Sequence, residues 1–359
     1  MSNENVSLAP AASPDKNKKM LHGLLKMPAF LPFVGLVLLF SCMAIFNDYF
    51  LTVDNLSTVA RQVSINAIIA IGMTFAILTG GIDLSVGAVM ALAGTLMAGL
   101  MKYYGLDPWL AILIGLFSGV AFGALNGFLT AYGKMPPIIV TLGTMIIAKG
   151  LALIYTGGYP ISGLPDSFAF WGREYLFGIQ VPIILMVVLY LIFYIVLNHM
   201  PFGRYVYSLG GNEEAARLSG LRVKYYKLLV YVISGFTASF AGLIFTSRVM
   251  SGQPNAGVGF ELDAIAAVVL GGASIAGGRG MIIGTLIGAM MLGVLNNGLN
   301  LLGISPYVQY VVKGLIIWGA TFIREGANKQ VISSQADSLI KISRIWADFF
   351  PANTSNQPI

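Results

Sequence analysis

Few residues in this chain are of the types that carry out catalysis. Its 359 residues include two His, one Cys and 15 Asp and Glu, and the carboxylates are not clustered in the sequence. A zinc site needs three or four ligands from these residue types, and nucleophilic catalysis needs a nucleophile held beside a base. Neither a metal site nor a catalytic triad is therefore expected.

The glycine-rich segment Gly277-Gly278-Arg279-Gly280 is the nearest approach to a phosphate-binding loop. It lacks the Lys and the following hydroxyl residue that hold phosphate and Mg²⁺ in the Gly-x-x-x-x-Gly-Lys-Ser/Thr motif, and that motif occurs nowhere in the sequence. The chain is therefore not expected to be an enzyme, to hydrolyse ATP or to bind a cofactor.

Uncharged polar side chains lie inside long apolar segments, where they are costly and usually face the interior of a bundle. Amides and hydroxyls suit a pathway for a neutral polyol, because each sugar hydroxyl both donates and accepts hydrogen bonds. The alternative is that each makes a structural hydrogen bond between helices, worth ~0.6–2 kcal/mol, and that Asp83 caps a helix. The candidate pathway residues are Asn66, Thr74, Asp83, Ser85, Asn126, Thr141, Thr144, Asn296, Asn297 and Asn300.

Two cations, Lys149 and Lys313, also fall inside apolar segments. An unpaired charge there costs ~2.5 kcal/mol or more, so each is expected to pair with a carboxylate or to extend toward the interface. Carboxylates are almost absent from the segments, with Asp263 at the edge of one as the exception. One functional class to consider is an ion- or proton-coupled secondary transporter. The scarcity of carboxylates counts against it.

One charged loop predicts a short helix at Asn212–Leu218. Asn212 is a favourable N-cap, Glu213 and Glu214 occupy the first turn, and Arg217 lies near the end, which complements the helix dipole. Gly220 is placed to end the helix. A rigid helix between two membrane segments is suited to receive force from a cytoplasmic partner, although an ordinary capped surface helix has the same pattern.

The apolar segments predict an all-α polytopic membrane protein with about ten transmembrane helices. Hydrophobic residues make up 57% of the chain and charged residues 10%, against the ~25% charged residues of soluble domains. The eighth predicted span is short and glycine-rich and is a candidate for a broken or re-entrant helix. The ten spans are Ala29–Phe46, Val63–Thr79, Leu84–Met101, Trp109–Tyr132, Ile138–Ile154, Val181–Leu197, Leu228–Thr246, Leu262–Ala276, Met281–Leu301 and Tyr307–Ile323.

The distribution of basic residues predicts that both termini are cytoplasmic. Of the 21 Lys and Arg residues, fifteen fall on the side of the N-terminus and only Arg61, Lys102, Arg173 and Arg248 fall on the other. This bias follows the positive-inside rule. It also accounts for the net charge of +6 without a nucleic-acid partner.

Three regions are expected. Residues 1–28 are expected to be a disordered, basic cytoplasmic lead, residues 29–324 the transmembrane domain, and residues 325–359 a cytoplasmic tail. From Ala336 onward the tail predicts an amphipathic helix, which lies either on the inner membrane surface or on the protein's own cytoplasmic face.

Three motifs together carry a family resemblance. They are Gly80-Gly81-Ile82-Asp83-Leu84-Ser85-Val86-Gly87, the Glu213-Glu214-Ala215-Ala216 loop with its following Gly220, and Gly271-Gly272-Ala273-Ser274 with Gly277–Gly280. The first and third are also weakly similar to each other, as in transporters with internal repeats. In this order, from about residue 30 to 325, the chain resembles the ribose/xylose/galactoside permease family of binding-protein-dependent ABC importers.

The resemblance implies a permease subunit in the bacterial inner membrane that translocates a small neutral sugar or polyol, with ribose-like sugars favoured. It implies a cytoplasmic ABC ATPase that uses the ATP, a periplasmic or extracellular solute-binding protein, and a permease homodimer in membrane lipid. It also implies that the charged loop is the coupling helix, with Gly210, Asn212, Glu213, Glu214, Ala215, Ala216, Arg217, Ser219 and Gly220 facing the ATPase. The sequence leaves the particular sugar open.

Overall fold

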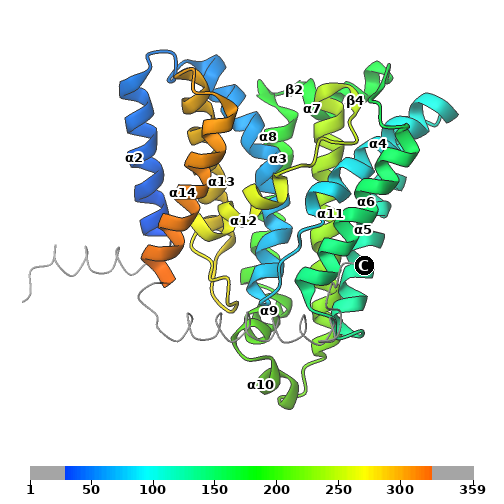
Figure 1. Ribbon diagram of the computed structural model, residues 1–359, viewed down its shortest axis with the longest axis vertical. Helices are drawn as coiled ribbons and strands as arrows, with labels where there is room; N and C mark the ends of the chain where they lie inside the picture. Colours follow the sequence, from blue (N-terminus) through cyan, green and yellow to red (C-terminus); the bar gives the residue numbers. More distant parts are fainter. Residues whose placement is uncertain (1–28, 326–359) are drawn as a thin grey trace, which may run out of the picture.

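The computed structural model describes residues 29–325 of the chain, and the side chains of residues 320–325 are not described. These residues form a bundle of helices (Figure 1). The long helices are α2 (Phe30–Phe46), α3 (Val53–Leu78), α4 (Val86–Tyr104), α5 (Pro108–Ala131), α6 (Pro137–Thr156), α8 (Val181–Asn198), α11 (Val223–Val249), α13 (Ile282–Leu301) and α14 (Pro306–Glu325).

Short elements connect them. The helical ones are the 3-10 turn η1 (Asp166–Ala169) and the helices α7 (Phe170–Arg173), α9 (Pro201–Gly211), α10 (Glu213–Leu218) and α12 (Phe260–Leu270). Strand β1 (Ile161–Ser162) pairs antiparallel with β4 (Ser251–Gly252), and β2 (Tyr175–Leu176) pairs antiparallel with β3 (Ile179–Gln180). The first of these pairs ties the loop after α6 to the end of α11.

The prediction of an all-α polytopic membrane protein is confirmed, and a helix lies at each of the ten predicted spans. Seven of the described helices are long and apolar enough to cross a membrane, namely α3, α4, α5, α6, α8, α11 and α13. Helix α3 begins ten residues before the predicted Val63, at Val53, where the Thr52 side chain accepts a hydrogen bond from the Asn55 backbone at 3.3 Å. Its polar first turns lowered the local hydropathy and hid this start from the sequence.

Helix α12 is half a span. Its 11 residues rise ~16 Å, about half of a ~30 Å hydrocarbon core. The predicted span continued to Ala276, but the chain leaves the helix at Gly271, where a Cβ would overlap the backbone of α13 at Gly284. Gly271, Gly272 and Ala273 are buried, so this non-helical backbone is surrounded by protein rather than lipid.

Helix α3 forms the centre of the bundle. It packs against α8, α11, α12 and α13, and from Ala67 to Leu78 every side chain is buried. Helices α5 and α6 instead expose large apolar residues, among them Leu113, Phe117, Ile146 and Ile154. A fully buried central helix within apolar outer helices is the arrangement expected of a protein surrounded by lipid.

Helices α5 and α11 approach closely through glycines. Gly119, Gly123 and Gly127 recur every fourth residue on one face of α5, and a Cβ on Gly119 or Gly123 would overlap a carbonyl oxygen of α11. Small residues at this spacing let helix backbones come together in membranes. The contact fixes α11, which continues directly from the charged loop.

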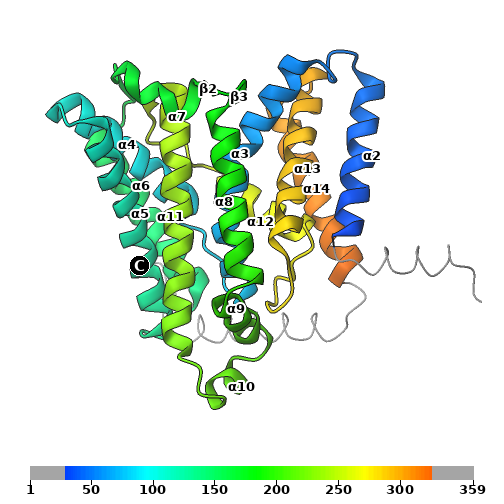
Figure 2. The same ribbon diagram turned by 180° about the vertical axis from the view of Figure 1, so that it is seen from behind.

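The two ends of the described chain lie at the same end of the bundle as α10, while α7 and the short strands lie at the opposite end (Figures 1 and 2). This arrangement agrees with the predicted topology, in which residues 204–227 and both termini are cytoplasmic.

We expect single cysteines to confirm this sidedness. In a Cys42→Ser background, Ser219→Cys, after α10, should react with an impermeant thiol reagent only from the cytoplasmic side. Tyr159→Cys, at a side chain 78% exposed near the opposite end, should react only from outside. The measurement is labelling in right-side-out and inverted vesicles, and the reverse pattern would contradict the topology.

Candidate functional site

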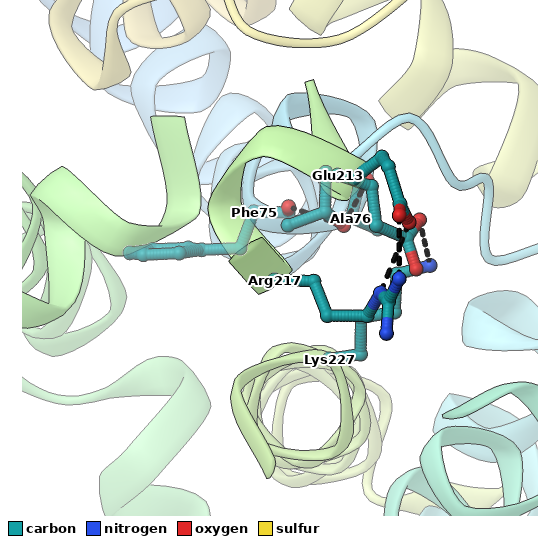
Figure 3. Close-up of polar contacts among 7 residues, drawn as sticks. Phe75, Ala76, Glu213, Arg217 and Lys227 are labelled. Carbon is teal, nitrogen blue, oxygen red and sulfur yellow. Dashed lines mark hydrogen bonds and ion pairs between the residues drawn. The ribbon is translucent and has the colours of Figure 1, made fainter. Parts of the chain in front are cut away.

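A capping hydrogen bond and two ion pairs hold the α10 segment in place, and Figure 3 shows the ion pairs that involve Glu213, Arg217 and Lys227. The Asn212 side chain accepts a hydrogen bond from the Ala215 backbone at 2.9 Å, which confirms the predicted N-cap. Arg217 pairs with Glu214 at 2.5 Å, and Lys227 of α11 pairs with Glu213 at 2.5 Å. The hydrogen bond from Arg217 lowers the pKa of the Glu214 carboxyl. The Lys227 pair links α10 directly to the helix that follows it.

The end of α10 is set by Gly220. This residue has a φ of 84°, and its backbone N–H donates to the carbonyl of Arg217 at 3.1 Å. The N–H of Leu221 donates to the carbonyl of Ala216 at 3.2 Å. This is a Schellman motif, which favours glycine because other residues rarely adopt a positive φ. The predicted helix stop is confirmed.

One expectation for α10 is wrong. Ala216 was expected to offer a small surface to a partner, but it is buried against Leu209 and Val223 of the chain itself. Ala215 is exposed, as are Glu213, Glu214 and Arg217. The six-residue helix is too short for its inward face to be recognised from the sequence.

Sequence reasoning also missed Leu218. Its side chain is 74% exposed at the end of α10, among charged neighbours. An apolar side chain exposed on an otherwise polar helix is available for a contact that would remove it from water. The signal available in the sequence was a leucine in a charged loop, between Arg217 and Ser219.

Glycines bring α9 against the cytoplasmic ends of two other segments. A Cβ on Gly210 would overlap the carbonyl oxygen of Leu78, at the end of α3, and the backbone nitrogen of Gly278. The Gly278 N–H donates to the same Leu78 oxygen at 2.9 Å, and the Tyr207 hydroxyl donates to the carbonyl of Gly280 at 2.8 Å. We call this meeting point of Gly210, Leu78 and Gly277–Gly280 the glycine junction.

The two glycine-rich motifs that resemble each other in sequence also touch at this junction. A Cβ on Gly277, which has a φ of 90°, would lie 2.9 Å from the backbone nitrogen of Gly80. The connection from α3 to α4 and the connection from α12 to α13 are therefore neighbours. Helix α9 contacts the end of α3 and the second of these connections through backbone atoms.

A buried chain of hydrogen bonds joins four helices around Asp83. One Asp83 carboxylate oxygen accepts from the Ser85 backbone at 3.0 Å and from its hydroxyl at 2.6 Å, and the other accepts from the Ser234 hydroxyl of α11 at 2.7 Å. The Asn126 amide donates to the Ser85 hydroxyl at 2.9 Å and accepts from Thr144 at 2.5 Å. Asp83, Ser85, Asn126 and Thr144 were predicted together, whereas Ser234 was missed.

The other predicted pathway residues lie apart from this chain. Thr141 donates to the carbonyl of Ile82 at 3.2 Å, and Thr74 bonds to Thr285 of α13 at 2.8 Å. Asn297 and Asn55 exchange two amide hydrogen bonds, at 2.7 and 3.0 Å. All are buried, so they make the structural hydrogen bonds of the alternative interpretation. Their role in translocation stays a prediction.

Asn66, Asn296 and Asn300 are less enclosed. Asn66 and Asn296 are half-buried and Asn300 is exposed, and the side-chain oxygens of Asn66 and Asn296 are buried without a hydrogen-bond partner. Asn296 and Asn300 line a cavity of about 260 Å³ between α3, α13 and α14.

The two intramembrane lysines differ. Lys313 pairs with Asp263 of α12 at 3.1 Å, as the pairing hypothesis expected. Lys149 is exposed and lines a cavity of about 420 Å³ together with Glu261. Across residues 29–325, no three His, Cys, Asp or Glu residues lie close enough to hold a metal ion.

A polytopic helical bundle with a charged segment at one end and buried hydrogen-bonded polar side chains is the architecture of a multi-pass membrane protein, and it fits a transport subunit. The family model described as "branched-chain amino acid transport system / permease component" matches residues 55–321. The chain belongs to this family of permeases, and it is a multi-pass protein of the inner membrane.

Curated relatives agree over most of the chain. The ribose import permease of Bacillus subtilis strain 168 is 52% identical over 288 residues, which cover 80% of this chain and 89% of that protein. The ribose import permease of Escherichia coli K12 is 44% identical over 81% of this chain and 91% of its own length. The L-arabinose transport system permease of the same strain is 41% identical over 80% and 87%. No solved structure matches the chain.

The glycine junction predicts that substitution by alanine lowers the stability of the protein at one of two adjacent glycines and not at the other. Gly210→Ala should destabilise the protein, because its Cβ would overlap the Leu78 carbonyl and overpacking costs ~1–3 kcal/mol or more. Gly211→Ala is the matched control, since its Cβ would meet nothing within 4 Å. Thermal unfolding of the purified proteins in detergent is the measurement. Equal melting temperatures for the two variants would contradict the junction.

Proposed function

We propose that this chain is the membrane-spanning permease subunit of an ATP-driven ABC importer for a small neutral sugar, with ribose-like sugars favoured. The main support is the 52% identity to a ribose import permease over 288 residues, or 80% of this chain. Relatives named for D-allose and L-arabinose, at 42% and 41% identity, support a polyhydroxylated neutral substrate. A binding protein outside the membrane delivers that substrate.

We propose that a separate cytoplasmic ABC ATPase supplies the energy and that this chain binds no cofactor. The α10 segment supports this assignment, because Glu213, Glu214, Arg217 and Leu218 are exposed on a helix braced at both ends. The glycine junction then gives a route by which force from the ATPase would reach the membrane helices. It carries movement of α9 to the end of α3 and to the connection between α12 and α13.

We propose that two copies of the permease form the functional unit, with the conduit at or near their interface. Within one copy, the buried hydroxyls and amides are largely occupied by bonds to one another. The exposed Lys149 and the half-buried Glu261 lie on α6 and α12. Because charges are costly against lipid, this surface is better suited to face water or a second copy.

The ion- or proton-coupled alternative gains no support. Asp83 is bonded to Ser85 and Ser234, and Asp263 is paired with Lys313. Both carboxylates therefore have structural partners, and neither is left to relay a proton.

Reconstitution tests the proposed function. Vesicles that contain the permease and its ATPase should take up ribose only when the binding protein and ATP are both present, and a panel of pentoses, hexoses and polyols should rank the substrates. Omission of the ATPase is the control. Uptake by the permease alone, driven by a proton gradient, would instead establish a secondary transporter.

Leu218 should contribute to ATPase docking. Leu218→Asp removes an apolar contact worth ~1.5–3 kcal/mol, which corresponds to about 10- to 150-fold in affinity. Phe177→Asp is the matched control, because Phe177 is 93% exposed at the opposite end of the bundle. Co-purification of the ATPase should fall for the first variant alone. Unchanged co-purification of the Leu218 variant would remove this residue from the docking surface.

A further inference from the structure

A polar cavity of about 260 Å³ opens between α3, α13 and α14. This volume is several times the ~30 Å³ share of a water molecule and lies below the ~300–1,000 Å³ of pockets for drug-sized ligands. It therefore suits a small solute. Seven residues line it: Gln62, Asn296, Asn300, Pro306, Gln309, Tyr310 and Lys313.

The hydrogen bonds of the cavity are only partly used by the protein. Gln309 donates to the Asn300 side-chain oxygen at 2.7 Å and to the carbonyl of Ile304 at 2.9 Å, which fixes both amides in place. The Asn296 side-chain oxygen is buried with no partner. An amide in this position stays costly until water or a solute bonds to it.

The cavity carries no net charge to attract an anion. The Lys313 ammonium bonds to both oxygens of Asp263, at 3.1 and 3.2 Å. The pair leaves neutral amides and the Tyr310 phenol as the groups open to a ligand. Amides donate and accept in the same way that adjacent hydroxyls of a polyol do. The Lys313 ammonium lies 5.9 Å from the centroid of the exposed Tyr310 ring, and the rest of that ring offers an apolar surface to the C–H groups of a sugar.

The position of the cavity is suited to a solute that enters the protein from outside rather than one that is released inside. Asn300 and Pro306 flank the connection from α13 to α14, which lies at the end of the bundle opposite α10 (Figure 1). A solute delivered from outside would meet this end first.

We propose that this cavity is an entry site that binds one neutral polyol, through Asn296 as the hydrogen-bonding group and Tyr310 as the apolar surface, with Gln62 in the wall beside them. The assignment rests on the proposed function for the identity of the solute as a sugar. The prearranged Asn300–Gln309 pair holds the rim of the site.

Single-cysteine protection tests the site in the full chain, assembled with its ATPase in vesicles. In a Cys42→Ser background, Gln62→Cys should react from the outside with an impermeant methanethiosulfonate reagent, and ribose should slow the reaction. At a ribose concentration ~10 times the dissociation constant, the rate should fall about tenfold. Tyr159→Cys, outside the cavity, should react at the same rate with and without ribose.

A second variant separates sugar binding from simple hydration. Asn296→Leu keeps the size of the side chain and removes its amide, so Gln62→Cys in that background should react as before but lose the protection by ribose. Labelling without protection in the parent variant would show that the cavity holds water only and would overturn the site. Failure to label from outside would also overturn it.

Wild-type vesicles measured in parallel keep the two proposals distinguishable. ATP-dependent ribose uptake by the wild type without protection at Gln62→Cys would leave the function standing and remove the site. Protection without such uptake would support the site and contradict the ABC-driven function.

Discussion

The close approach of three backbone segments at the glycine junction is the constraint on which the α10 end of the molecule depends. Gly210 lies against the Leu78 carbonyl and Gly278, and any side chain at position 210 would push these segments apart. Because the contacts are between backbone atoms, the segments cannot shift past one another by side-chain rotation, as they could if long side chains separated them. The charged segment is therefore connected to the interior of the bundle by close backbone contacts.

A second constraint is the need to satisfy polar groups inside a membrane. The Asp83 chain meets this need with Ser85, Ser234, Asn126 and Thr144, so that α4, α5, α6 and α11 share one continuous set of hydrogen bonds. Each bond adds only ~0.6–2 kcal/mol, but the set fixes the relative positions of these helices. Near α14, by contrast, the side-chain oxygen of Asn296 has no hydrogen-bond partner in the protein, so it is open to water or a solute.

Much of the fold was predictable from the sequence, because a lipid environment requires long apolar helices and hydropathy reports them directly. The early start of α3 could not be predicted from hydropathy, because its first turns are polar and precede the apolar segment. The local capping of α10 by Asn212 and Gly220 was predictable because it depends on neighbours in the sequence. The inward burial of Ala216 and the bond from Ser234 to Asp83 depend on residues far along the chain, which no local pattern reveals.

The half-length of α12 links these observations. A full helix at this position would carry the chain across the membrane and leave no backbone to meet α9. By leaving the helix at Gly271, the chain places Gly277–Gly280 at the junction, while Asp263 in the first turn of α12 holds Lys313 of α14. One short helix is thus connected to α9 through the segment after its C-terminus and to the proposed entry cavity through its N-terminal turn. Backbone contacts at the glycine junction and the Asp263–Lys313 ion pair place the two regions at opposite ends of the same short helix.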